Sequence, residues 1–125
     1  MAQGKQILLV DDQADAIDAL ALLLELDGHT VRTAYSGADA LAAVATFVPD
    51  LALIDVAMPD MNGMELARAL SQQPALAHTR LVALTGFGGP DDKRREQAAG
   101  FHAHLTKPVS AEQLTRLIAD AGTPQ

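Results

Sequence analysis

Side chains that can do chemistry follow four apolar segments of the sequence. Asp11 and Asp12 come directly after the first of these segments, Asp55 and Thr85 each come directly after a later one, and Lys107 follows the last segment after Thr106. Carboxylates, a hydroxyl and an ammonium are groups that can bind a divalent cation and a phosphoryl group. Each residue alone is explained equally well as a turn, a cap or a strand end. Their meaning therefore depends on whether the fold brings them together.

Three carboxylates in one cluster repel one another, and without a counter-charge the pKa of at least one of them would be raised. A hard divalent cation relieves this repulsion. Oxygen ligands that leave room for water and a substrate phosphate are typical of Mg²⁺ rather than zinc or an enclosed calcium ion. The histidines show no ligand spacing with the cluster and are interpreted as surface or partly buried residues: His29, His78, His102 and His104.

The elements that must position these residues alternate along the chain. Apolar runs predict strands over 6–10, 30–34, 51–54, 81–84 and 103–105, and the second and fifth of these have the weakest patterns. Helical spacing predicts helices over 14–26, 40–45 and 90–100, with two further helices built around Leu66 and Leu114. The first helix is expected to bury one face, formed by Ile17, Leu20, Leu23 and Leu24.

Capping residues mark several helix ends. Ser36 with Asp39, and Ser110 with Gln113, have the three-residue spacing of a capping box, and Asn62 can cap the helix that carries Leu66. Asp27-Gly28 is a stop signal for the first helix, and Pro74 follows the end of the third.

Five alternations of strand and helix predict a parallel sheet, because each return to the same edge requires a crossover helix. The prediction is one doubly wound α/β domain over residues 1–125. Only 3% of the residues are aromatic, which suits aliphatic helices packed on such a sheet. Ligands bind beyond the carboxyl ends of the strands in this architecture, where the candidate residues lie.

The charge and composition exclude several classes of function. A net charge of −7 repels nucleic acid and acidic membranes. The absence of cysteine excludes disulfides and thiolate metal sites and agrees with a reducing cytoplasm. Acidic residues interrupt the leucine-rich segment 14–26, and the first residues lack the apolar core of a signal peptide. A cytoplasmic protein without a membrane span is therefore expected.

Four segments resemble the motifs of the receiver domain of two-component response regulators, the CheY-like family, and the resemblance covers essentially the whole chain. They are Val10-Asp11-Asp12, the segment 53–63 (LIDVAMPDMNG), Leu84-Thr85-Gly86 and Thr106-Lys107-Pro108-Val109. Any one of them is a weak signal, but all four in this order and at these separations are highly specific. The resemblance implies a flavodoxin-like (βα)5 sandwich with a five-stranded parallel sheet in the order 2-1-3-4-5.

The resemblance also implies a role for each carboxylate. Asp55 is expected to accept a phosphoryl group from a phosphohistidine, since an aspartate is a competent covalent acceptor that gives an acyl phosphate. Mg²⁺ is expected to be bound by Asp12, Asp55 and the backbone carbonyl of Ala57, while Asp11 acts largely through water.

The remaining residues of the motifs are expected to handle the phosphoryl group. Lys107 would pair with its oxygens, and Thr85 would move to hydrogen-bond one of them after transfer. Pro108 would shape the loop that aims Lys107, because its φ is fixed and it has no N–H donor. The expected partners are a sensor histidine kinase or a histidine phosphotransfer protein and one downstream protein. No nucleic acid or membrane is expected, and the domain is expected to be a monomer or a weak dimer.

Three positions depart from the pattern of the family. His104 stands where many receivers carry a Tyr or Phe whose side chain rotates inward on phosphorylation. Either the imidazole makes the same rotation, or His104 is a half-exposed strand residue without a signalling role. Neither Ala57 nor Phe87, which flank the acceptor site, can polarise a water molecule. We therefore expect slow loss of phosphate and no enzymatic turnover.

Two neighbouring segments have open interpretations. The glycine-rich segment 86–90 lacks the Lys-Ser/Thr ending of a nucleotide P-loop, and a mobile connection is the better interpretation. The mixed-charge run 91–96 is typical of a solvated helix face, with partner binding as the alternative.

Other classes of function remain as alternatives. A phosphatase of the haloacid dehalogenase type would place a second Asp two residues after the nucleophile, where this chain has Ala57. A flavodoxin-like FMN carrier would need hydroxyls and amides in the first loop, where acidic residues would repel the ligand. A receiver that serves only as a docking module is a third alternative. The domain could act alone or as part of a larger protein such as a hybrid sensor kinase.

Overall fold

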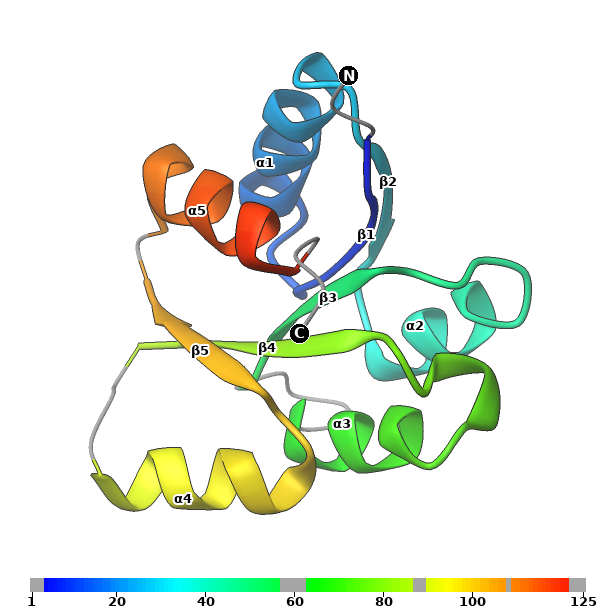
Figure 1. The fold of residues 1–125 in the computed structure, drawn as a ribbon, viewed down its shortest axis with the longest axis vertical. Coiled ribbons are helices and arrows are strands. Elements are labelled where there is room, and N and C mark those ends of the chain that lie inside the picture. The colour runs from blue at the N-terminus through cyan, green and yellow to red at the C-terminus, as the bar shows by residue number, and fades with distance from the viewer. Residues whose placement is uncertain (1–3, 57–62, 87–89, 108, 122–125) are drawn as a thin grey trace.

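The computed structural model describes residues 4–56, 63–86, 90–107 and 109–121, which form a five-stranded sheet with helices on both faces (Figure 1). The strands are β1 (Gln6–Val10), β2 (Thr30–Ala34), β3 (Leu51–Asp55), β4 (Arg80–Thr85) and β5 (Ala103–Thr106). All neighbouring strands are parallel, and their spatial order is β2-β1-β3-β4-β5. The expected doubly wound, flavodoxin-like fold and its strand order are confirmed.

The helices connect the strands as crossovers. They are α1 (Ala14–Leu26), α2 (Gly37–Ala43), α3 (Gly63–Ser71), α4 (Pro90–Ala99) and α5 (Ala111–Ala121), with a short 3-10 helix, η1 (Pro74–Leu76), before β4. The capping box at the start of α5 is confirmed, since the N–H of Gln113 donates to Ser110 Oγ at 3.1 Å and the N–H of Ser110 donates to Gln113 Oε1 at 3.0 Å. The expected cap Asn62 lies outside the described residues.

Helix α2 differs from the sequence prediction. It begins at Gly37 and ends at Ala43, whereas a helix over 40–45 was expected. The cap explains the earlier start, because Ser36 Oγ accepts the N–H of Asp39 at 3.0 Å and the helix begins directly after its capping residue.

Two hydrophobic layers hold the helices on the sheet. Helices α1 and α5 cover one face, packing Ile17 and Leu114 against β-strand residues such as Leu53. Helices α2, α3 and α4 cover the other face, where Leu66 packs against residues such as Ile54. Both central strands β1 and β3 are buried on their two sides, as expected for a parallel sheet between helical layers.

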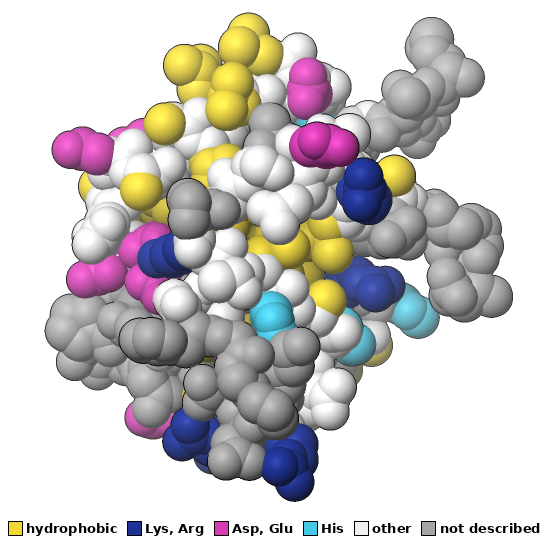
Figure 2. Space-filling model, turned by 90° about the vertical axis from the view of Figure 1, so that its left-hand side faces the viewer, with side chains coloured by type: hydrophobic (Ala, Val, Ile, Leu, Met, Phe, Trp, Pro, Cys, Tyr) yellow, Lys and Arg dark blue, Asp and Glu magenta, His cyan; other side chains and the backbone are white. Residues whose placement is uncertain are grey.

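The solvent side of α1 is more apolar than expected. The buried residues of this helix are Ile17, Ala21 and Leu24, whereas the side chain of Leu23 is exposed, so the prediction that Leu23 faces the core is wrong. The buried residues follow one another at spacings of four and three residues, and the orientation of the helix on the sheet leaves Leu23 on the solvent side. Apolar side chains accordingly gather at the end of the molecule where α1 ends (Figure 2). None of the described helices is long and apolar enough to cross a membrane.

Candidate acceptor and metal site

The candidate residues meet at the carboxyl edge of the sheet. Asp11 follows β1, Asp55 and Thr85 are the last residues of β3 and β4, and Lys107 follows β5. Backbone hydrogen bonds fix these strand ends relative to one another: the N–H of Asp11 donates to Ala34 O at 3.1 Å, and that of Lys107 donates to Thr85 O at 2.8 Å. The parallel register therefore brings together side chains that lie far apart in the sequence.

Three carboxylates form the centre of the site. Asp11, Asp12 and Asp55 each offer one oxygen, and these oxygens all lie within 4.8 Å of one another. Asp11 and Asp55 are buried, with exposed fractions of 2% and 6%, whereas Asp12 is exposed. Oxygen donors that are partly open to solvent fit Mg²⁺, which keeps several waters when it binds to protein carboxylates.

Lys107 supplies the positive charge of the cluster. Its Nζ lies 2.9 Å from Asp11 Oδ2 and 3.3 Å from Asp55 Oδ2. One ammonium thus faces two buried carboxylates, and the third carboxylate adds a further negative charge. This excess of negative charge favours a divalent cation beside the lysine.

The protonation states of Asp11 and Lys107 follow from their contacts. Burial by itself would raise the pKa of the Asp11 carboxyl, but the backbone N–H of Gln13, at 3.0 Å, and the Lys107 ammonium hold that pKa below the ordinary value of 3.8. Burial would likewise lower the pKa of Lys107, but Asp11 and Asp55 raise it above the ordinary value of 10.5. Both groups are therefore charged at neutral pH.

The start of α3 lies directly against the end of β3. A Cβ atom on Gly63 would lie 2.6 Å from the carbonyl oxygen of Asp55 and 2.6 Å from the Cα of Val56. Only a residue without a side chain fits this approach. Gly63 thereby lets the start of α3 pack directly against the backbone of Asp55 at the end of β3.

A groove opens beside the carboxylates and Lys107. It encloses about 440 Å³ between α1 and the residues that follow β5. Asp11 and Lys107 line one part of it, and apolar side chains such as Ile17, Leu20 and Val109 line the rest.

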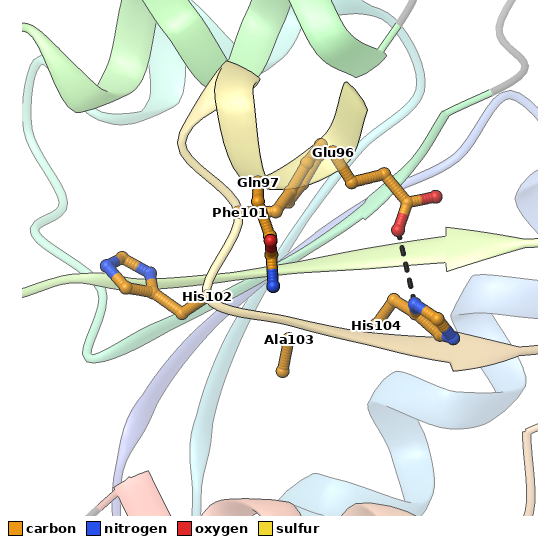
Figure 3. Close-up of a pocket in the computed structure, with 6 residues that line it drawn as sticks. All are labelled: Glu96, Gln97, Phe101, His102, Ala103 and His104. Atoms are coloured by element: carbon orange, nitrogen blue, oxygen red, sulfur yellow. Dashed lines mark ion pairs between the residues drawn. The ribbon is translucent and has the colours of Figure 1, made fainter. Parts of the chain in front are cut away.

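Not every residue expected at the site can be placed. Ala57, Phe87 and Pro108 lie outside the described residues. His104 is described, and it lies on β5, where its Nδ1 is 3.2 Å from Glu96 Oε1 (Figure 3). The interpretation of the four histidines as surface or partly buried residues is confirmed.

Glu96 is the residue that sequence reasoning missed. The run 91–96 was expected to form a solvated face, and Arg94 and Arg95 are indeed exposed, but Glu96 is only 3% exposed. The sequence contains one signal for this burial, since Glu96 precedes the buried Ala99 by three residues and the two share one face of α4.

Comparison with known proteins decides the family. The sequence profile of the response regulator receiver domain matches residues 7–119. The chain belongs to the response regulator receiver family. Receivers are signalling domains rather than classical enzymes, they generally bind Mg²⁺ at an acidic cluster, and they interact with histidine kinases or phosphotransfer proteins and with downstream targets.

Individual receivers are similar over the whole domain. The chain is 33% identical to protein PilH of Pseudomonas aeruginosa, covering 90% of this chain and 93% of PilH. It is 39% identical to the gliding motility regulatory protein of Myxococcus xanthus over 93% of this chain, but it spans only 16% of that protein's length. The crystal structure of the chemotaxis protein CheY4 of Vibrio cholerae superposes with a TM-score of 0.89 at 30% identity, covering 96% of this chain and 99% of CheY4.

Proposed function

We propose that this receiver, formed by residues 1–125, accepts a phosphoryl group on Asp55 from a phosphohistidine of a partner protein and changes its binding to a downstream protein. One observation carries the proposal: Lys107 Nζ lies within 3.3 Å of both Asp11 and Asp55, and Asp12 lies in the same cluster. Transfer of a phosphoryl group requires little besides positioning and neutralisation of charge on its oxygens. The cluster offers the groups for both tasks.

The acceptor step uses Asp55 as the nucleophile. One carboxylate oxygen forms a bond to phosphorus while the bond from phosphorus to the imidazole nitrogen of the donor breaks, and the electron pair of that bond stays on the imidazole. The ammonium of Lys107, already beside Asp55, is placed to pair with the phosphoryl oxygens. In this proposal Thr85, which ends the neighbouring strand β4, hydrogen-bonds one of these oxygens after transfer.

The acidic residues would hold the cation. In this proposal Asp12, Asp55 and the backbone carbonyl of Ala57 would hold Mg²⁺, while Asp11 would act through water. A bound Mg²⁺ would neutralise charge on the phosphoryl oxygens. The short contact between Asp11 and Lys107 supports a separate duty for Asp11, which is to orient the ammonium. Pro108 is proposed to shape the loop that aims Lys107.

The partner would approach along the groove beside α1. Its apolar walls lead to Asp11 and Lys107, so a helix with an apolar face and a phosphorylated histidine could bring phosphorus to Asp55. A sensor histidine kinase or a histidine phosphotransfer protein has this chemistry.

Incubation with acetyl phosphate and Mg²⁺, followed by intact-mass measurement, tests the proposal. The wild type and an Asp27→Asn control, which changes an exposed aspartate at the end of α1, should each gain one phosphoryl group. Asp55→Asn should gain none. Failure of the wild type to gain mass would indicate a docking module without phosphorylation. Steady turnover of phosphate monoesters would indicate a phosphatase. A flavin absorbance band would indicate an FMN carrier.

A further inference from the structure

A histidine precedes each edge strand of the sheet. His29 lies directly before β2 and His102 directly before β5, and these strands are the two outer ones. In both cases the ring accepts a backbone N–H through Nδ1: His29 accepts that of Lys5 at 2.9 Å, and His102 accepts that of Leu81 at 3.0 Å. Each imidazole thus takes the place of a backbone carbonyl at the amino end of the sheet.

Backbone hydrogen bonds complete both arrangements. The N–H of Thr30 donates to the carbonyl of Lys5 at 2.9 Å, and the N–H of His102 donates to the carbonyl of Leu81 at 2.8 Å. His102 and Leu81 therefore exchange a hydrogen bond through the backbone and another through the side chain. The same pairing occurs at both edges of the sheet, so it belongs to the way in which the sheet is closed.

Strand β5 has little burial of its own. None of its four residues is buried, whereas both central strands are buried almost throughout. Its carboxyl end is fixed where the N–H of Lys107 donates to Thr85 O at 2.8 Å, and its amino end is fixed by the exchange between His102 and Leu81. A short edge strand with so little buried surface opens locally more easily than the core, so the hydrogen bonds at its ends matter.

The side-chain bond at the amino end requires one protonation state of the ring. A neutral imidazole that accepts at Nδ1 carries its proton on Nε2, whereas a protonated imidazole has an N–H on both nitrogens and accepts nothing. Leu81 is only 2% exposed, so an N–H that lost this acceptor would be left in a poorly solvated place. His102 itself is exposed, and histidine is the side chain that changes its charge between about pH 5 and 8.

Charged and titratable groups lie near His102 on two elements. Glu96 of α4 and His104 of β5 line a cavity of about 70 Å³ together with His102, but Figure 3 shows the ring of His102 pointing away from these two side chains. Glu96 instead faces His104, at 3.2 Å. Arg80 precedes Leu81 in β4, and its side chain leaves the strand on the other face because successive residues alternate.

The side of α3 and η1 offers His102 no charged partner. A cavity of about 210 Å³ adjoins His102 there, and its described lining residues contribute apolar side chains and the hydroxyls of Ser71 and Thr79. A protonated ring would therefore find no carboxylate on this side. Protonation of His102 thus removes an acceptor without creating an ion pair among these lining residues.

We infer that His102 makes the attachment of the edge strand β5 depend on pH. Above the range in which histidine titrates, the neutral ring accepts the N–H of Leu81 and the amino end of β5 is closed. As the pH falls through that range, Nδ1 gains a proton, the bond to Leu81 opens and the amino end of β5 loosens. The carboxyl end stays closed through Lys107. The inference is independent of phosphorylation and therefore of the proposed function.

Two NMR measurements on the wild type test the inference. At about pH 7.5 the ring nitrogen signals of His102 should show a neutral imidazole with its proton on Nε2. Between about pH 7.5 and 5.5 the protection of the Leu81 amide against hydrogen exchange, relative to an unstructured peptide at the same pH, should fall by roughly threefold to tenfold, the factor for losing one hydrogen bond. The protection of the β3 amides should not change. A proton on Nδ1 at the higher pH, or equal protection of Leu81 at both pH values, would overturn the inference.

Three variants identify the titrating group. His102→Asn puts an amide oxygen near the place of Nδ1 and does not titrate, so the protection of Leu81 should be the same at both pH values. His102→Ala has no acceptor, so the protection should be low at both. His104→Gln is the matched control, because it removes the other histidine of β5, and it should keep the pH response of the wild type. Loss of the response in His104→Gln, or an unchanged response in His102→Asn, would assign the effect to another group and overturn the inference.

Discussion

Lys107 Nζ lies 2.9 Å from Asp11 Oδ2, although 96 positions separate the two residues in the sequence. The same ammonium lies 3.3 Å from Asp55 Oδ2. A single cation thus compensates two carboxylates that are almost completely buried. The stability of the domain and the proposed chemistry of its site therefore depend on the same side chain.

Lys107→Met should destabilise the domain in the presence of EDTA. The variant leaves Asp11 and Asp55 buried without their cation, and we expect the free energy of unfolding to fall by about 1–3 kcal/mol, allowing for the partial exposure of Lys107. Excess Mg²⁺ should restore part of this loss. Urea denaturation measures both effects. Arg116→Met, which breaks an exposed pair, should change stability by at most about 0.5 kcal/mol. A Lys107 variant as stable as this control would contradict the charge argument.

Asp12→Asn should remove most of the stabilisation by Mg²⁺. A cation that binds only the folded state adds about 2.7 kcal/mol at a hundred times its Kd, which raises the Tm of the wild type. The variant lacks one carboxylate of the cluster, so its Tm should rise only weakly with Mg²⁺. In EDTA it should be no less stable than the wild type, because the repulsion of Asp12 with Asp11 and Asp55 is removed. Thermal unfolding with and without Mg²⁺ measures this. Asp15→Asn, at an exposed aspartate in the first turn of α1, should retain the full response.

The stability should depend on pH through Asp11 and Lys107. Since the pKa of Asp11 is lowered in the folded state, its contribution is complete above the ordinary value of 3.8 and is lost as pH falls through the lower folded pKa. The pKa of Lys107 is raised, so its contribution is complete below 10.5 and is lost as pH rises through the higher folded pKa.

Urea denaturation in EDTA at a series of acidic pH values measures this dependence. The free energy of unfolding should fall less steeply with decreasing pH in Asp11→Asn than in the wild type. The reason is that the variant lacks one group whose pKa differs between the folded and the unfolded state. Parallel curves for the two proteins would show that Asp11 has no lowered pKa.

Gly63→Ala should damage the fold and the acceptor site together. The added Cβ would meet the backbone of Asp55 and Val56 at 2.6 Å, so the start of α3 must move and the end of β3 with it. We expect a loss of about 1–3 kcal/mol in the free energy of unfolding and slower phosphorylation by acetyl phosphate. Gly86→Ala is the control, because a Cβ there meets no atom of the described residues within 4 Å. Similar stability and phosphorylation rates for the two variants would contradict the steric argument.

The acyl phosphate on Asp55 should be lost slowly. Neither Ala57 nor Phe87 carries a group that could orient an attacking water molecule. Time-resolved intact-mass measurement after removal of acetyl phosphate gives the half-life. A half-life of seconds in Mg²⁺ buffer would show that another group activates water.

The sequence was sufficient to predict the sheet and the residues at its edge, because Asp11, Asp55, Thr85 and Lys107 each follow or end an apolar run. The contacts between them were not predictable in the same way. That Lys107 reaches both Asp11 and Asp55 depends on the twist and register of strands β1, β3, β4 and β5.

Burial on single helices was the least predictable feature. Glu96 is buried opposite His104, and this placement depends on how α4 lies on the sheet. Leu23 and Leu24 are adjacent and chemically identical, yet only Leu24 faces the core. Local sequence cannot decide between such neighbours, since the direction of the helix relative to the sheet selects the buried face.

The position of Lys107 after the last strand of the sheet has a consequence for protein synthesis. On the ribosome, Asp11 and Asp55 emerge well before Lys107, and β5 adds to the edge of a sheet whose other strands have already been made. A nascent chain that lacks β5 would hold its carboxylates without the ammonium. The same edge strand therefore leads to the ammonium of the pocket and supplies the hydrogen-bond partners of β4.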